Sequence, residues 1–279
     1  MVFSAKRAPA TLASRQRLVV GCFFGALLLL GLVLVWGYGV SIDEMQERRT
    51  GLVSLKYVAT KFFPSFLEHH PELTAFNETL ADYGDRDYGV AFQLPVTWLE
   101  QVLDLPNGRA AYWLRHLCTF LVSMGGVAAL YQLARRRFES WQLGLLGATL
   151  LVLSPRLFAD FFYNPKDAVF MAFFTLALNT AVAFVARPTW RTAAWHALAC
   201  AIAIDTRVMG VVVPAATLGL LGLQMAHGAY RPRQVAARAG FYLLLLWGLV
   251  IACWPYLWAA PVPHFKEAFA NMSHFRWGG

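Results

Sequence analysis

Charged residues are scarce in this sequence, and their scarcity excludes an ordinary water-soluble domain. Asp, Glu, Lys and Arg together make up 14% of the 279 residues, whereas 58% are apolar. Soluble domains usually carry about 25% charged residues. We therefore expect most of the chain to lie inside a lipid bilayer.

Other absences narrow the functional classes. The four cysteines stand inside apolar runs without CxxC or Cys/His spacing, which favours structural cysteines over a zinc site or disulfides. There is no repeat of 20 to 50 residues and no low-complexity tract. The net charge of +8 comes from basic residues between apolar runs, so it indicates membrane topology rather than nucleic-acid binding.

What the sequence has instead is a series of long apolar runs. Because a helix needs about 20 residues to cross the hydrocarbon core, these runs predict an all-α polytopic protein with about seven transmembrane helices. The two shortest runs need neighbouring residues to complete a crossing. The runs, with few or no charges, are 18–42, 116–138, 140–155, 168–186, 192–204, 208–230 and 239–265.

The distribution of basic residues predicts the topology. If the chain begins with a cytoplasmic tail at 1–17 and changes side at each span, twelve Lys and Arg residues lie on the side of the N-terminus. Only five lie in the short segments on the opposite side. By the positive-inside rule, the N-terminus is cytoplasmic and the C-terminus external. Residues 18–279 then form one integrated membrane domain. The twelve are Lys6, Arg7, Arg15, Arg17, Arg135, Arg136, Arg137, Arg187, Arg191, Arg231, Arg233 and Arg238.

The only long connection, 43–109, is predicted to be an external loop, and it holds 11 of the 16 acidic residues. Apolar residues from Leu52 to Phe63 recur at helical spacing, which suits an amphipathic helix at the membrane surface. A second such stretch runs from Val90 to Leu103 and is interrupted by Pro95. We expect the loop to fold back onto the membrane as short amphipathic helices.

Four polar clusters adjoin the apolar spans, and all of them fall at the predicted external face. Ionisable groups within a membrane cost at least about 2.5–3.5 kcal/mol and are retained mainly for function. The clusters are Ser41-Ile42-Asp43-Glu44, Arg115-His116, Asn164-Pro165-Lys166-Asp167 and Asp205-Thr206-Arg207.

Each cluster also has a structural interpretation. Ser41 with Glu44 fits a capping box, and Asn164 with Pro165 and Asp167 fits a helix start. Arg115 and His116 would snorkel toward the headgroups, and Asp205 with Arg207 would form a local ion pair. His196 is expected to be a packed histidine, and Trp254, Tyr256 and Trp258 an interfacial belt.

Together, the clusters also suit one chemistry. A lipid-linked phosphate lies at the headgroup level, where Lys166, Arg207 and Arg115, with His116 beside them, would neutralise it. Asp43 would act as a general base on an acceptor hydroxyl or amine, and Glu44 would orient it. Asn164, Asp167 and Asp205 would support these groups. The sequence indicates no particular metal ion or other cofactor.

The order of these motifs resembles the GT-C glycosyltransferases, and within them the bacterial members of glycosyltransferase family 39 related to protein O-mannosyltransferases and aminoarabinose transferases. The resemblance covers about residue 40 to the end. It implies a polyprenyl-phosphate sugar donor, a lipid, glycan or protein acceptor, transfer at the external face of a bacterial inner membrane, and Asp43 as catalytic acid or base. It rests on Ile42-Asp43-Glu44, Tyr88-Gly89-Val90-Ala91-Phe92, Arg115-His116-Leu117, Ser154-Pro155-Arg156 through Asp167, and Ile204-Asp205-Thr206-Arg207.

Two other classes of function stay open on sequence grounds. A transporter or lipid flippase would show ionisable residues nearer mid-span and two related halves, and no such repeat is visible. A non-catalytic assembly subunit would be indifferent to the loss of Asp43, whereas an enzyme would not.

Overall fold

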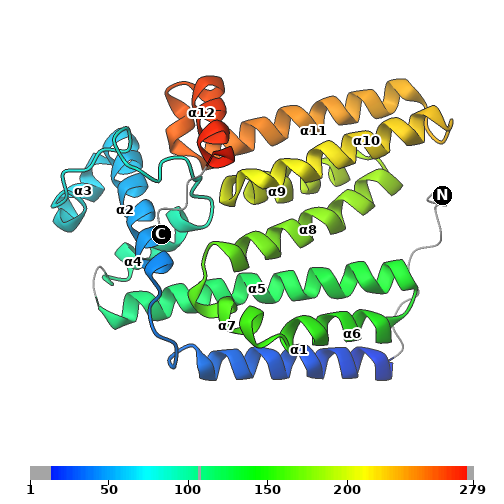
Figure 1. Ribbon diagram of the computed structural model, residues 1–279, viewed down its shortest axis with the longest axis horizontal. Coiled ribbons are helices and arrows are strands. Elements are labelled where there is room, and N and C mark those ends of the chain that lie inside the picture. The colour runs from blue at the N-terminus through cyan, green and yellow to red at the C-terminus, as the bar shows by residue number, and fades with distance from the viewer. Residues whose placement is uncertain (1–13, 106–107, 275–279) are drawn as a thin grey trace.

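A computed structural model describes residues 14–105 and 108–274, and every regular element in this part of the chain is a helix, which confirms the all-α prediction. The helices α1, α5, α6, α8, α9, α10 and α11 lie side by side, while α2, α3, α4 and α12 gather at one end of the bundle (Figure 1). The predicted tail 1–17 lies mostly outside the described residues. The helices are α1 Ser14–Leu34, α2 Ile42–Phe62, α3 Pro64–His69, η1 Pro71–Leu73, α4 Gln93–Val102, α5 Arg109–Phe138, α6 Trp141–Val152, α7 Pro155–Tyr163, α8 Asp167–Ala186, α9 Trp190–Thr206, η2 Val208–Val211, α10 Val212–Ala226, α11 Pro232–Cys253, η3 Pro255–Trp258 and α12 Pro261–Ser273.

Five helices of the described chain are long and apolar enough to cross a membrane, or six if α6 and α7 together form one bent span. The expected count of seven is not confirmed. The run at 192–204 builds α9, whose 17 residues extend only about 26 Å at the α-helical rise of about 1.5 Å per residue. The run at 140–155 ends in a bend of 72° between α6 and α7.

That bend has a local cause. Pro155 is the first residue of α7, and Ser154 before it is extended, with φ −73° and ψ 109°. A residue that precedes proline is pushed out of the helical region by its contact with the proline ring. The chain therefore turns at this point, and α7 brings Tyr163 to the end of the bundle that also holds α2.

Small residues let the membrane-length helices approach closely. A Cβ atom on Gly126 of α5 would lie 2.7 Å from the Cα atom of Ala172 in α8. Buried alanines of α9, Ala193, Ala197 and Ala201, face the core in the same way. Close backbone approach at small residues is the usual basis of helix association in membranes.

The expected external loop is helical, but its helices differ from those predicted. α2 has 21 residues and is not short, and it buries the polar residues Glu44, Glu47 and Thr50. Phe62 and Phe63, expected on its apolar stripe, are exposed, as residues that face lipid would be. Pro95 lies in the first turn of α4, where a backbone N–H has no partner within the helix, so the missing N–H of proline breaks no hydrogen bond. α4 is therefore a continuous helix through Pro95.

Candidate functional site

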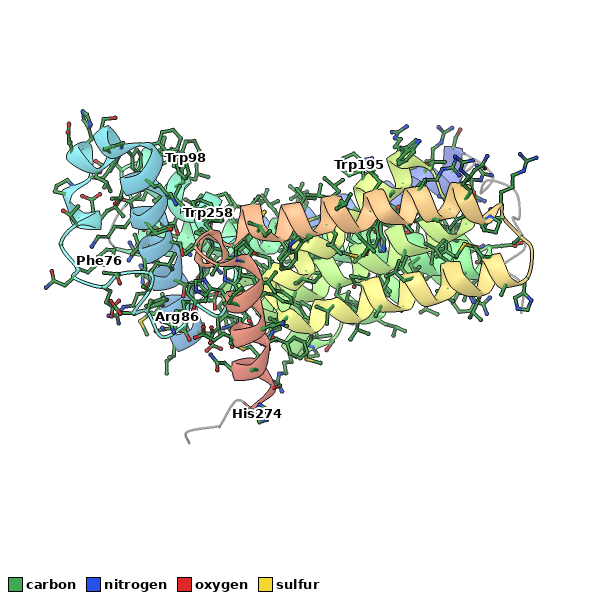
Figure 2. The ribbon with its side chains drawn as sticks, turned by 90° about the horizontal axis from the view of Figure 1, so that it is seen from above. Phe76, Arg86, Trp98, Trp195, Trp258 and His274 are labelled. Carbon is green, nitrogen blue, oxygen red and sulfur yellow. The ribbon has the colours of Figure 1, made fainter. Side chains whose placement is uncertain are left out.

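All four polar clusters lie at one end of the bundle (Figure 1), the end that carries α2 and α4. This follows from the alternating direction of the helices, since the clusters stand at the start of α2, α5 and α8 and at the end of α9. The basic residues in the last turn of α5, in the α8–α9 connection and between α10 and α11 lie at the other end. In the view from above, the labelled Arg86 and Trp258 lie at the end of the bundle that holds α2 and α12 (Figure 2).

The first turn of α2 is held by Ser41. The hydroxyl oxygen of Ser41 accepts a hydrogen bond from the Glu44 N–H at 3.1 Å, as the capping prediction requires. The same hydroxyl donates to the carbonyl of Tyr163 at 2.9 Å, which ties α2 to the end of α7. Asp43 is exposed in this turn. The reciprocal half of the capping box is wrong, because the Glu44 carboxyl turns inward to His116.

Glu44 and His116 form a buried pair. The Glu44 Oε2 atom lies 3.0 Å from His116 Nε2. The other ring nitrogen, Nδ1, lies 3.3 Å from the carbonyl oxygen of Val35 and must donate to it. Burial raises the pKa of Glu44, and this effect outweighs the opposing contact with His116. Glu44 Oε1 is buried and has no hydrogen-bond partner within the described chain.

Arg115 is fully buried and anchors α4, so the snorkelling interpretation is wrong. Its three guanidinium nitrogens contact Glu100 Oε2 at 3.1 Å, Gln93 Oε1 at 3.0 Å and Thr97 Oγ1 at 2.7 Å. Arg48 of α2 also donates to Glu100, from Nε at 2.8 Å. One carboxylate therefore joins α2, α4 and α5. A guanidinium with several directed partners is well suited to such a junction.

Lys166 lies between the α7–α8 junction and α2. Its ammonium is 2.9 Å from Glu47 Oε1 and 3.4 Å from the centre of the Tyr88 ring. Burial by itself would lower the pKa of Lys166, but the Glu47 carboxylate outweighs it, and the pKa is raised. Glu47 also accepts from Gln93 Nε2 at 3.0 Å. The Glu47 carboxylate thus favours the charged ammonium in a partly buried setting.

Asp205 holds the segment that contains Tyr88 against the end of α9. Its carboxylate accepts from the Ala91 N–H, and its carbonyl oxygen accepts from the Gly89 N–H at 3.0 Å. A Cβ atom on Gly89 would lie 1.9 Å from the Asp205 carboxylate, so only glycine fits there. Two of the stretches behind the GT-C resemblance are therefore in direct contact.

Arg207 pairs with Asp167 of α8 and not with Asp205, so the local ion-pair interpretation is wrong. Asn164 Oδ1 accepts from the Asp167 N–H at 2.9 Å, as predicted for a helix cap. However, α8 begins at Asp167, which leaves Pro165 before the helix rather than at its first position. Asn164, Lys166, Asp167 and Arg207 consequently lie at one junction beside α2.

The remaining singled-out residues are structural. His196 is packed and hydrogen-bonded as expected, 3.0 Å from Thr180 Oγ1 and 2.9 Å from Thr217 Oγ1. The interfacial-belt interpretation is wrong for Trp254, which is buried and donates to the Arg86 carbonyl at 3.0 Å. Tyr256 is also buried. In the described ranges, no group of three His, Cys, Asp or Glu residues is placed to hold a metal ion.

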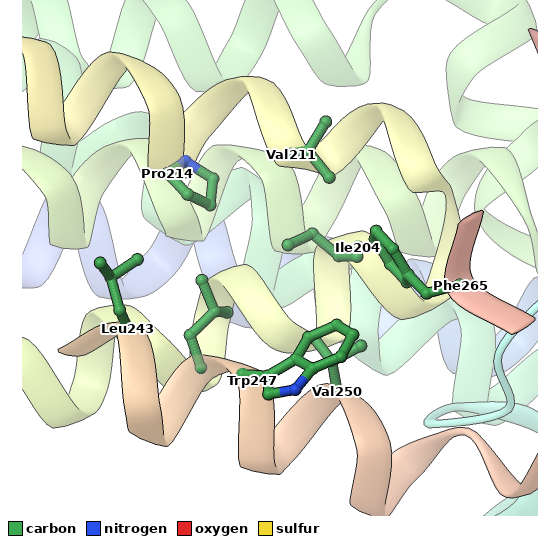
Figure 3. Close-up of a pocket in the computed structure, with 8 residues that line it drawn as sticks. Ile204, Val211, Pro214, Leu243, Trp247, Val250 and Phe265 are labelled. Atoms are coloured by element: carbon green, nitrogen blue, oxygen red, sulfur yellow. The ribbon is translucent and has the colours of Figure 1, made fainter. Parts of the chain in front are cut away.

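An apolar pocket of about 210 Å³ opens next to this end of the bundle (Figure 3). It lies between α9, α10, α11 and α12, and Ile204, directly before Asp205, forms part of its wall. Its lining residues are Ile204, Val211, Pro214, Leu243, Leu246, Trp247, Val250 and Phe265.

Sequence reasoning missed several members of this site. Glu47 and Arg48 lie three and four residues after Glu44 on α2. Gly51 lies four residues after Glu47 and packs closely on Thr97. That spacing marks one polar face of a helix and would have identified it. Tyr88 belongs to a stretch behind the family resemblance but was given no role in the site. The other missed residues are Gln93, Thr97 and Glu100.

A bundle of membrane-length helices with acids, amides and cations gathered at one end defines a polytopic membrane protein with a polar site at a membrane boundary. The chain belongs to the dolichyl-phosphate-mannose-protein mannosyltransferase family, whose model matches residues 107–258. It is therefore a membrane glycosyltransferase of the GT-C type, which confirms the resemblance. No curated protein and no solved structure matches the chain. The family match includes Arg115, Lys166, Asp205 and Arg207, and it begins after Asp43.

Proposed function

We propose that the protein transfers a sugar from a polyprenyl-phosphate donor to an acceptor at the end of the bundle formed by α2, α4 and the α7–α8 junction. In this proposal, that end faces the external or periplasmic side of a bacterial inner membrane and the N-terminus is cytoplasmic. The excess of basic residues at the opposite end supports this orientation. The family match favours the enzyme over the transporter and the assembly subunit.

The observation that carries the proposal is the contact of Lys166 with Glu47, one helical turn after Asp43 on α2. Asp43 is exposed on the first turn of α2. Ser41 fixes this turn by a hydrogen bond from the Glu44 N–H and another to the Tyr163 carbonyl. Glu47 stands four residues later, and residues at this spacing are neighbours on a helix surface, about 5–6 Å apart. Lys166 contacts Glu47. The exposed carboxyl of Asp43 therefore lies about one helical turn from the carboxylate that holds the partly buried ammonium of Lys166.

This arrangement fits a displacement at the anomeric carbon of the sugar. Asp43 takes the proton from the acceptor hydroxyl or amine, and the acceptor atom forms the new bond to the anomeric carbon. The bond from that carbon to the phosphate oxygen breaks, and polyprenyl phosphate leaves with the electron pair. Lys166 and Arg207 stabilise the charge on the leaving phosphate. Isoprene units near the phosphate would lie in the apolar pocket that begins at Ile204.

Arg115 and His116 have a different place in the proposal. The direct phosphate contact expected from the sequence stays a prediction. In the structure, Arg115 contacts side chains of α4 and His116 contacts Glu44. These contacts favour positioning roles, in which Arg115 fixes α4 and His116 fixes the turn that presents Asp43.

Donor binding tests the proposal. Binding of undecaprenyl phosphate to the detergent-solubilised full chain is measured by native mass spectrometry for the parent, Lys166→Ala and Arg207→Ala. Loss of one charge-assisted contact is worth about 1.5–3 kcal/mol, so we expect binding to weaken about 10- to 100-fold. Lys266→Ala removes an exposed cation on α12 and serves as the matched control. If Lys166→Ala and Arg207→Ala bind the lipid as tightly as Lys266→Ala, the proposed phosphate site is wrong.

A further inference from the structure

A second cavity lies at the opposite end of the bundle, between α1 and the last turns of α5. Its volume is about 330 Å³, and it has an apolar and a polar part. The proposed sugar-transfer step uses none of its residues. They are Phe24, Ala128, Tyr131, Gln132, Arg135 and Arg136.

The hydroxyl of Tyr131 has no partner in the described part of the chain. Tyr131 is only 6% exposed, and its ring packs edge-on against Phe24, with the ring centres 6.0 Å apart. Its hydroxyl oxygen is buried without a hydrogen bond. Buried polar groups in native proteins almost always have a partner. A ligand atom in the cavity would supply one.

The two arginines of the cavity stand about one turn nearer the end of α5. Four or five residues of helix correspond to about 6–8 Å along the axis. Arg136 donates to Asn179 Oδ1 at 2.7 Å, and the Asn179 amide donates in turn to Gln132 Oε1 at 3.3 Å. The Arg136 guanidinium is thus oriented by α8 before any ligand arrives.

We propose that this cavity binds the headgroup of an anionic phospholipid. The phosphate lies between Arg135 and Arg136, and the Tyr131 hydroxyl donates to an oxygen of the glycerol ester one turn deeper. The first acyl carbons contact Phe24 and Ala128. Along the helix, the two arginines are followed by the Tyr131 hydroxyl and then by the apolar wall. A phospholipid presents its phosphate, its ester groups and its acyl chains in the same order. Basic pockets between membrane helices are typical sites for such headgroups.

The rule that cations flank membrane spans accounts for the arginines but not for the cavity or the buried hydroxyl. A soluble phosphate would explain the arginines and leave the apolar wall unused. A lipid accounts for all three features. α1 supports this choice, because its outer face exposes Leu29, Leu30 and Val33, as expected of a helix in contact with lipid.

The test is lipid binding to the purified full chain in detergent, measured by native mass spectrometry with phosphatidylglycerol and with phosphatidylcholine. We expect preferential binding of phosphatidylglycerol. Tyr131→Phe keeps the ring and removes only the unpartnered hydroxyl, and loss of one hydrogen bond should weaken this binding about 3- to 10-fold. The double variant Arg135→Gln/Arg136→Gln should weaken it at least about tenfold.

Arg137→Gln is the matched control, since it removes the same kind of charge one residue further along and outside the cavity. It should bind phosphatidylglycerol like the parent. Equal losses in Arg137→Gln and in the double variant would show general charge attraction and overturn the proposal. Unchanged binding by Tyr131→Phe, equal binding of the two lipids, or displacement of phosphatidylglycerol by excess glycerol 3-phosphate would also overturn it.

Discussion

Replacing Arg115 by methionine should strongly destabilise the protein while leaving its apolar packing nearly unchanged. Methionine keeps the unbranched stem but loses the contacts to Glu100, Gln93 and Thr97. Glu100 would then stay fully buried with Arg48 as its partner. Removing one member of a buried ion pair costs about 3–5 kcal/mol, because the remaining charge is left poorly compensated.

This cost corresponds to a large change in unfolding temperature. A chain of this size loses about 2–4 °C per kcal/mol, so Arg115→Met should unfold about 6–20 °C below the parent. The measurement is thermal unfolding in detergent at one fixed heating rate. Arg109→Gln, in the exposed first turn of the same helix, is the control and should stay within about 0.5 kcal/mol of the parent.

A double variant shows whether the loss comes from the Glu100 carboxylate, which has then lost one of its two arginine partners. Adding Glu100→Gln to Arg115→Met removes the buried negative charge. The double variant should therefore lose about 0.5–3 kcal/mol less stability than the sum of the losses of the two single variants. An unfolding temperature for Arg115→Met equal to that of Arg109→Gln would refute the network. In that case Arg115 would not hold α4, and the snorkelling interpretation would replace it.

Three further predictions use other parts of the chain. Gly126→Ala would place a Cβ atom 2.7 Å from a Cα atom of α8 and should cost about 1–3 kcal/mol in thermal unfolding, whereas the neighbouring Gly125→Ala, with nothing within 4 Å, should be nearly neutral. Burial raises the pKa of Glu44, so the contribution of this carboxyl to stability is present below the ordinary glutamate pKa and is lost as the pH rises through the raised pKa. The side chain of Glu44→Gln stays neutral at every pH. The unfolding temperature of Glu44→Gln should therefore fall less than that of the parent protein between acidic and neutral pH. Cysteines introduced at Asn77 and Arg136 should be labelled by a membrane-impermeant thiol reagent from opposite sides of the membrane, and labelling from one side would contradict the proposed orientation.

The fold class was predictable because it depends on composition and on the spacing of charges. Long runs without charge require helices, and alternating helix directions bring Asp43, Arg115, Lys166 and Asp205 to the same end. The number of spans was less predictable. The break at Pro155 has a local cause, but whether α6 and α7 together make one span, and whether the 17-residue α9 makes one, depends on the packing of the neighbouring helices.

The partners of the polar residues were not predictable from local sequence. Arg115 near a helix start either turns outward to the headgroups or inward to a protein acid, and the choice depends on α4 lying against it. Glu47 and Gln93 are 46 residues apart and meet only because α4 packs on α2 at Gly51. Arg207 likewise pairs with Asp167 and not with Asp205, although Asp205 is only two residues away, because Asp205 is turned toward the segment of Gly89 and Ala91.

The contrast between Asp43→Asn and Glu44→Gln in sugar transfer tests the central claim most directly. The assay follows release of polyprenyl phosphate from polyprenyl-phosphate mannose in vesicles that contain the full chain, with a membrane extract as source of acceptor. General-base catalysis contributes about 10²–10⁴ in rate, so Asp43→Asn should lose that much while its donor binding stays near that of the parent. Glu44→Gln keeps a hydrogen-bonding group at His116 and should lose far less. An Asp43→Asn enzyme as active as the parent would contradict the account, and equal large losses at both positions would show that the two acids act as a pair.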